Sequence, residues 1–145
     1  MRVSARSDYG LRALIELANN YDNGPQQSSD IANRRHIPGQ YLDQLLTVLR
    51  KTGFIRSTRG PGGGHSLIRE PSSIKVREVI EAFEGSLSSV GWLDEPAELT
   101  DHPHLCGQRE IWEKVRDATA DILDSYTILD LLEREPRATV GRYSI

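Results

Sequence analysis

The first third of the chain repeats apolar residues at helical spacing, separated by a polar break. Apolar side chains three and four positions apart predict a first helix over about residues 7–21. A break rich in Asn, Gly, Pro and Gln follows, after which Ser28 or Ser29 is suited to cap a short second helix. That helix ends ahead of Pro38, because the residue before a proline disfavours helical geometry.

The next segment predicts a third helix that is apolar on one face and polar on the other. It starts at Pro38, whose missing N–H is not needed in a first turn, and ends at Gly53, which suits the left-handed position after a helix. Its inward face is formed by four leucines at i, i+3, i+4 and i+7, namely Leu42, Leu45, Leu46 and Leu49. The opposite face presents Gln40, Asp43, Gln44, Thr47 and Lys51.

Beyond Gly53 the apolar period changes from helical to strand-like. Two short runs, FIRSTR and HSLIRE, flank GPGGG, which contains enough glycine to reverse the chain. Residues 54–70 are therefore predicted to form a β-hairpin. Helical spacing then returns with Val76, Val79, Ile80 and Phe83 and ends at Gly85.

The carboxyl-terminal part predicts a long loop, a long helix and a capped short helix. Residues 86–107 show no apolar period, and a helix over about residues 108–126 follows. Thr127 and Asp130 form a capping box for a last helix, and the tail from residue 135 is expected to be loose. The long helix has two apolar stripes, more than one small domain needs to cover. We therefore expect a homodimer that pairs through Ile111, Trp112, Val115, Ala118, Thr119, Ile122, Leu123 and Tyr126.

Composition and charge describe a globular chain with two unlike halves. The 145 residues, 37% hydrophobic and 27% charged, suit one domain-sized core and exclude disorder, a collagen repeat and a disulfide scaffold. No apolar run of about 20 residues and no signal peptide is present, so we expect a cytoplasmic protein without membrane contact. Residues 1–77 carry 12 Lys or Arg and 6 Asp or Glu, whereas residues 78–145 carry 6 and 15. Unless this asymmetry serves solubility alone, it indicates that one face meets a polyanion.

Three helices followed by a hairpin are the element order of a winged helix-turn-helix, a mainly α fold with a small β-hairpin wing. In this fold the second helix of the pair, here residues 38–52, enters the DNA major groove. We expect residues 1–85 to form the DNA-binding domain, 86–107 a sensor-type loop, and 108–134 the dimerisation helix with the short terminal helix. Amide and hydroxyl groups can bind base edges, so the polar face of the third helix indicates base recognition more than an exposed face without a ligand. Asp43 fits only if it accepts a hydrogen bond from cytosine or orients a neighbour.

The hairpin is an independent indication of nucleic-acid binding. Its glycines remove side-chain bulk, so the tip can approach a sugar-phosphate backbone and Arg59 can enter a minor groove. A nucleotide-binding phosphate loop does not fit, because GPGGGH is not followed by Lys-Ser or Lys-Thr and opens a strand. A plain flexible turn is the remaining alternative. Outside the polar face of the third helix, the predicted DNA contacts are Ser28, Tyr41, Arg56, Arg59, Gly60 and His65.

The stretch PGQYLDQLLTVLRKTGFIRSTRGPGGGHSLIREPSSIKVREVIEAFEG at residues 38–85, with the start SDYGLRALIELA, resembles the Rrf-type bacterial transcription regulators. That family includes the iron-sulfur cluster regulator and the nitric-oxide-sensing repressor. The resemblance implies a homodimeric DNA-binding protein, expected to act as a repressor at a pseudo-palindromic operator. It implies a minor-groove contact by Arg59 and base contacts by Gln40, Asp43 and Gln44. His65 stands where the family usually has Tyr, so the resemblance does not decide the structure at the base of the wing.

Many members of that family hold an iron-sulfur cluster through three cysteines before the long helix, whereas this chain has only Cys106. Thr100 and Asp94 occupy the positions of the other two. We therefore expect no cofactor, and Cys106 is then a plain buried thiol or a single redox-sensitive one whose thiolate Arg109 and the helix N-terminus would favour. The alternatives are an iron-sulfur cluster completed by histidine or carboxylate ligands, or another metal at His102, His104 and Cys106.

Two other function classes compete with DNA binding. An enzyme needs an oriented nucleophile and base, and Cys106 with His104 in a proline-containing loop does not form such a pair, so we expect no catalysis. A protein-interaction adaptor would explain the acidic half and the spare apolar stripe without DNA. The family resemblance adds a signalling protein as a partner that is compatible with DNA binding.

Overall fold

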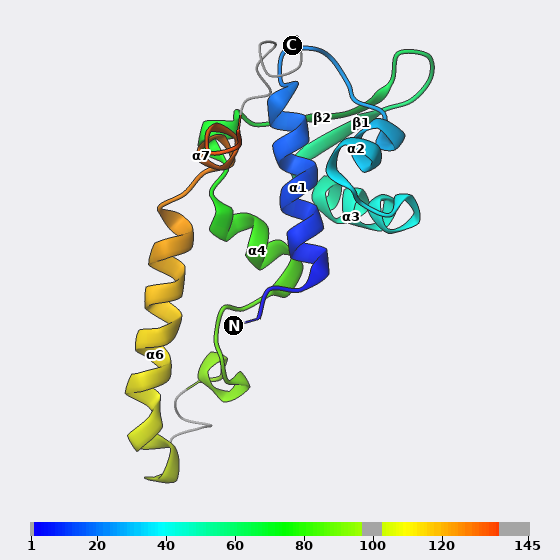
Figure 1. Cartoon of the computed structure of the whole chain (residues 1–145). Coiled ribbons are helices and arrows are strands. Elements are labelled where there is room, and N and C mark those ends of the chain that lie inside the picture. The colour runs from blue at the N-terminus through cyan, green and yellow to red at the C-terminus, as the bar shows by residue number, and fades with distance from the viewer. Residues whose placement is uncertain (1, 97–102, 137–145) are drawn as a thin grey trace.

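The computed structural model describes residues 2–96 and 103–136, with the backbone but not the side chains of residues 103–106. The amino-terminal region consists of α1 (Ala5–Asn19), α2 (Ser28–Arg35), α3 (Gly39–Lys51), β1 (Ile55–Thr58), β2 (Gly64–Leu67), the 3-10 helix η1 (Pro71–Ser73) and α4 (Val76–Glu84). The carboxyl-terminal region adds the 3-10 helix η2 (Gly91–Asp94), α6 (Pro103–Asp124) and α7 (Ile128–Glu133), as shown in Figure 1.

The element order confirms the predicted fold class, a mainly helical winged helix-turn-helix with a small hairpin. β1 and β2 pair antiparallel, from Ile55 opposite Leu67 to Thr58 opposite Gly64. The chain leaves α3 through Gly53, whose φ of 85° is the left-handed geometry predicted for the residue after that helix. The helix-turn-helix pair and the wing therefore follow one another along a single stretch of chain.

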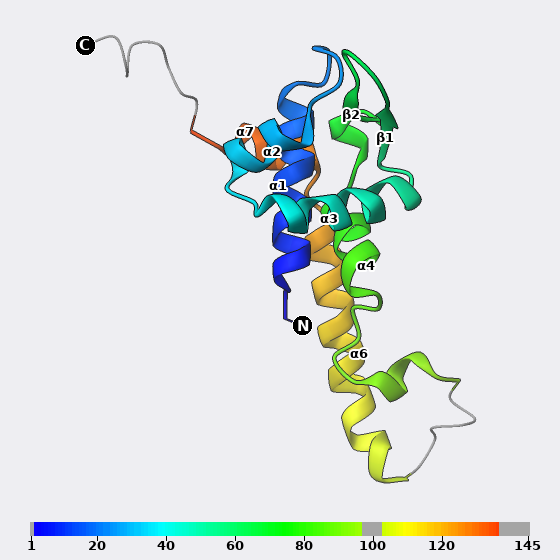
Figure 2. The same cartoon turned by 90° about the vertical axis from the view of Figure 1, so that its right-hand side faces the viewer.

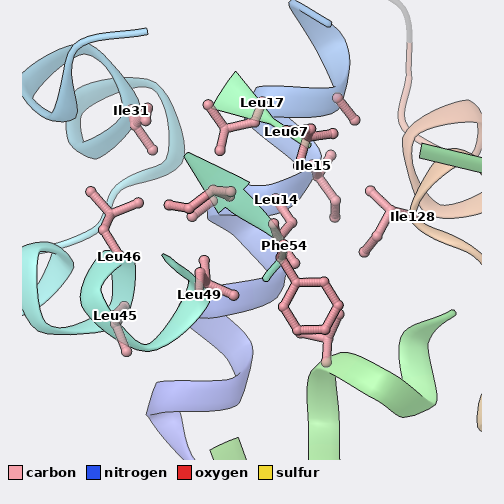
Figure 3. Packing of buried hydrophobic residues seen from close by; sticks show 14 of the residues in the cluster. Leu14, Ile15, Leu17, Ile31, Leu45, Leu46, Leu49, Phe54, Leu67 and Ile128 are labelled. Atoms are coloured by element: carbon pink, nitrogen blue, oxygen red, sulfur yellow. The ribbon is translucent and has the colours of Figure 1, made fainter. Parts of the chain in front are cut away.

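The main core lies between α1, α2, α3 and the hairpin, and Figure 3 shows it from close by. α1 runs through the middle and buries Leu14 and Leu17. All four leucines predicted for the inward face of α3 are buried, which confirms its orientation. The hairpin and α7 close the same cluster with Phe54, Ile55, Leu67 and Ile128.

Helix caps were predicted with mixed success. The capping box before α7 is confirmed, because the Thr127 hydroxyl accepts from the Asp130 N–H at 3.2 Å and the Asp130 carboxylate accepts from the Thr127 N–H at 2.8 Å. The predicted cap of α2 is wrong. Gln27 occupies the N-cap position, its side chain makes no capping bond, and Ser28 is already helical. α1 is capped by Ser4 and starts at Ala5, two residues before the predicted boundary.

The long helix starts earlier than predicted, at Pro103 instead of residue 108. The proline marked the segment as loop in the sequence, but its missing N–H costs nothing in the first turn of a helix. The segment predicted as loop is also interrupted by η2. Positions 104 and 106 therefore lie on a helix, although the side chains of His104 and Cys106, and all of His102, fall outside the described residues.

α6 lies on the opposite side of α1 and α4 from α3, and its amino-terminal half extends beyond the winged-helix region (Figures 1 and 2). Its carboxyl-terminal half packs on α4 through a second small cluster of Val76, Ile80, Leu87 and Ala120. No helix within residues 2–96 and 103–136 is long and apolar enough to cross a membrane.

Candidate nucleic-acid interface

The outward face of α3 carries the side chains predicted to read bases. Gln40, Asp43, Gln44 and Lys51 are exposed, and Thr47 is half-buried. The Thr47 hydroxyl donates to the Asp43 carbonyl at 2.9 Å, so it is already engaged within the helix. The leucines that fix the inward face of α3 therefore also fix which polar groups stand on its surface.

Tyr41, a predicted DNA contact, helps to anchor the start of α3. It is half-buried, and its ring meets the ring of Tyr9 in α1 edge-on at a centroid distance of 5.7 Å. The Arg12 guanidinium lies 5.1 Å from the Tyr9 ring centroid and donates to the Arg35 carbonyl at 3.3 Å. No local sequence pattern indicates these contacts between Tyr9, Arg12, Arg35 and Tyr41, because the four residues come from three separate helices.

A buried carboxylate in α1 joins α1 to α2, and its partner Arg35 also reaches the segment after α7. Glu16 is 3% exposed and forms ion pairs with Arg34 at 3.2 Å and Arg35 at 2.9 Å. Arg35 also pairs at 2.5 Å with Glu135, the residue at which the tail was expected to begin. Burial disfavours the Arg35 cation, but its bonds to Glu135 and Glu16 outweigh this and raise its pKa. The rest of the predicted tail, residues 137–145, lies outside the described residues.

The wing ends in a tight glycine turn. The Gly63 N–H donates to the Gly60 carbonyl at 2.9 Å, and Gly60 and Gly62 have φ values of 90° and 76°. A Cβ at Gly63 would collide with the Thr58 carbonyl oxygen, so this position requires glycine. Arg59 stands immediately before the turn and is exposed, as are Arg56 and Gly60.

His65 closes the base of the wing in the position where a tyrosine is usual in the resembling family. It is half-buried, its Nδ1 lies 2.8 Å from the Ser57 hydroxyl, and its backbone exchanges two 2.8 Å hydrogen bonds with Gln26. Burial lowers the pKa of His65; Asp43 acts in the opposite direction and Arg50 in the same direction. The histidine side chain is therefore bonded to β1 within the wing, and the hairpin keeps its expected shape.

Positive charge surrounds these groups. Arg50, Lys51, Arg56 and Arg59 are exposed, and none of them takes part in the ion pairs formed within the described part of the chain. Ser28 is half-buried at the first position of α2. An uncompensated basic surface beside exposed amide groups is suited to bind a phosphate backbone and base edges together.

The two predicted apolar stripes of α6 have different surroundings. Trp112, Thr119 and Leu123 are half-buried, and Leu123 packs against the second small cluster beside α4. The other stripe remains uncovered in the single chain, with Ile111 57%, Val115 38% and Ile122 60% exposed and Ala118 also exposed. Tyr126 is 38% exposed under the Arg134 guanidinium. Leu123 therefore contributes to the fold, and the stripe of Ile111, Val115, Ala118 and Ile122 is the more exposed of the two in the single chain.

The chain lacks the three-cysteine donor set that holds the cluster in many members of the resembling family. The whole sequence contains one cysteine, so a cluster here would also need histidine or carboxylate ligands. Within the part of the chain that the structure describes, no three His, Cys, Asp or Glu residues are grouped to hold a metal. Arg109, expected to favour the Cys106 thiolate, has its guanidinium 5.2 Å from the ring centroid of Trp92 in η2.

Comparisons with known proteins agree with this geometry. The family model described as Rrf2, iron-dependent transcriptional regulator, matches residues 3–134. The chain is 38% identical over 133 residues to the HTH-type transcriptional regulator CymR of Bacillus subtilis, covering 90% of this chain and 89% of CymR. It is 32% identical over 135 residues to the HTH-type transcriptional regulator IscR of Escherichia coli, covering 93% and 82%. The solved structure of B. subtilis CymR superposes with a TM-score of 0.78 at 34% identity, covering 94% of this chain and 99% of that one.

Proposed function

Because the chain belongs to the Rrf2 family of iron-dependent transcriptional regulators, we propose that two copies of it bind one DNA duplex. In each copy, α3 enters a major groove and the wing contacts a minor groove. The observation that carries the proposal is the exposed Gln40 and Gln44 on α3, backed by four buried leucines and flanked by unpaired cations. The function is that of a DNA-binding transcriptional regulator. No enzymatic step is part of it, in line with relatives that are named as regulators.

Each exposed group on α3 has a role that its chemistry supports. The amides of Gln40 and Gln44 can pair with adenine, accepting and donating at once. Thr47 has already used its hydroxyl on Asp43, which leaves its methyl group for a thymine methyl. Asp43 is exposed on the same face, and it would fit by accepting a hydrogen bond from cytosine or by orienting a neighbour.

The wing supplies the minor-groove contact. Arg59 is exposed next to a turn that carries almost no side-chain bulk, so its guanidinium can reach between the two phosphate backbones. Arg56, Arg50 and Lys51 lie on the same basic surface and would pair with phosphates. In this proposal, α3 recognises the base edges and the wing recognises the shape of the minor groove.

Dimerisation uses the uncovered stripe of α6. Ile111, Val115, Ala118 and Ile122 lie on the side of α6 left free by its own chain. A two-fold pair would join identical patches and set two copies of α3 against half-sites about 10 base pairs apart, or a multiple of that spacing. Bound across a promoter, such a dimer would act as a repressor.

The test starts from a duplex selected from a random library with the wild-type chain. Gln44→Ala should weaken binding to it by about 1–3 kcal/mol and relax discrimination at one base position. Arg59→Ala should weaken binding and lower the salt slope by about one unit. Glu133→Ala, which truncates an exposed side chain on α7, is the control and should change neither the discrimination nor the salt slope. Equal binding of wild type and all three variants to every duplex across a salt titration would refute the proposal.

Signal sensing has one candidate residue in this chain. We propose that Cys106, which lies in the first turns of α6, responds to oxidation and alters DNA affinity without any cofactor. Peroxide treatment should change the affinity of the wild-type protein for the selected duplex and leave Cys106→Ser unaffected. An identical response of both proteins would rule out Cys106 as the sensor.

A further inference from the structure

The wing is bonded to a segment outside the hairpin, the residues that lead into α2. The backbones of Gln26 and His65 exchange two hydrogen bonds of 2.8 Å, which adds a short third edge to the two-stranded sheet. Gly64 permits this approach, because a Cβ there would lie 2.5 Å from the Gln26 carbonyl oxygen. Both views show the loop before α2 beside the hairpin (Figures 1 and 2).

Gln27 adds a side-chain bond that reaches the tip of the wing. It occupies the N-cap position of α2 but makes no capping bond there. Its Nε2 instead donates to the Gly63 carbonyl at 2.9 Å. Gly63 closes the turn that starts at Gly60, and Arg59 directly precedes that turn. The amide of Gln27 is therefore tied to the loop that carries the proposed minor-groove arginine.

The hydrogen bond between Gln27 and Gly63 matters because the wing is small. Two four-residue strands form a hairpin that is marginal by itself. A loop that is free to move must be ordered when it meets DNA, and that ordering reduces affinity. A loop already held at Gly63 presents Arg59 in one direction before binding.

We propose that Gln27 is a positioning residue for DNA recognition, which holds the wing loop at Gly63 and so sets the direction from which Arg59 enters the minor groove. The inference rests on the proposed function, because it takes Arg59 as a DNA contact. Gln27 acts through Arg59 and need not touch the duplex.

Gln26 offers a matched control. Its side chain donates to the Gly24 carbonyl at 3.3 Å and accepts from Arg34 at 3.5 Å, both away from the wing tip. Its two bonds to His65 are made by the backbone and survive a change of side chain. Gln27→Met and Gln26→Met therefore remove the same amide from neighbouring positions, and only the first removes the tie to Gly63.

The experiment is a double-mutant cycle on the full chain, with fluorescence anisotropy on the duplex selected from a random library by the wild-type protein. Gln27→Met should weaken binding about 3- to 10-fold, the range for one lost hydrogen bond, and Gln26→Met less than about 2-fold. In an Arg59→Ala background, Gln27→Met should add less than about 2-fold, because the residue it positions is gone. By NMR, the Gly63 amide should exchange faster in Gln27→Met than in Gln26→Met, at an unchanged melting temperature.

Three results would overturn the inference. Equal affinity of Gln27→Met and wild type would show that the tie does not matter for binding. The same loss with and without Arg59 would show that Gln27 acts on DNA directly or through the fold as a whole. An Arg59→Ala variant that binds like wild type would refute the proposed function of the wing itself, and is distinguishable because it does not involve Gln27.

Discussion

The uncovered stripe of α6 gives the most quantitative prediction. Truncating Ile122 to Ala removes apolar surface that the single chain leaves open, with 60% of the residue exposed. Alanine is the stronger helix former, so α6 itself should not lose stability. Any loss of self-association therefore reports on the surface between two copies.

The expected size follows from the exposed surface. Complete burial of an isoleucine side chain contributes about 1.5–3 kcal/mol, so the open part of Ile122 is worth about 1–2 kcal/mol per copy. A two-fold interface contains the residue twice, which doubles the effect to about 2–4 kcal/mol. Since about 1.4 kcal/mol corresponds to a factor of ten, the dimer dissociation constant should rise about 30- to 700-fold.

Sedimentation velocity over a protein concentration series measures this change. Ile68→Ala is the matched control, because Ile68 is 51% exposed but follows β2 at the wing, far along the chain from α6. It should leave the dissociation constant unchanged. If Ile122→Ala and Ile68→Ala dimerise equally well, or if the wild-type chain is a monomer at all concentrations, the reasoning from the exposed stripe is wrong.

Three further changes test the fold that carries the interface. Gly10→Ala places a Cβ against the Phe83 ring and should destabilise the protein by about 1–3 kcal/mol in chemical denaturation, despite the helix propensity gained. Glu16→Ala removes a buried carboxylate, leaves the half-buried Arg35 with one carboxylate fewer and should cost about 3 kcal/mol, so an unchanged unfolding free energy would contradict the importance of this ion pair. Hydrogen bonds, first from Ser4, hold the pKa of Glu84 below its usual 4.5, so its stabilising contribution is present above that value and is lost as pH falls through the lower folded value. Stability measured from pH 5 down to about pH 3 should therefore fall less steeply in Glu84→Gln than in wild type.

Local periodicity predicted most of the winged-helix region. The leucine face of α3, the left-handed Gly53 after it and the hairpin around GPGGG each depend on a few neighbouring residues, which a sequence displays directly. The start of α6 was missed because proline breaks a helix in its interior and opens one in its first turn, and the sequence around Pro103 does not separate these cases.

The contacts that shape the candidate site were not predictable in the same way. Gln27 and Gly63 are 36 residues apart, and Arg35 and Glu135 are 100 apart. Such pairs form only when α1, α2 and the wing pack together, and no local sequence pattern predicts them. The polar face of α3 was predicted correctly as an exposed surface, whereas its contact with DNA stays a prediction.

In the proposed complex, two chains place two copies of α3 in neighbouring major grooves of one duplex. Hydroxyl-radical footprinting on the selected duplex tests this arrangement of the two α3 helices. Sedimentation of the same complex measures the number of chains per duplex. Two protected patches about 10 base pairs apart, or a multiple of this, with two chains per duplex are the predicted result. A single protected patch with one chain per duplex would contradict the account.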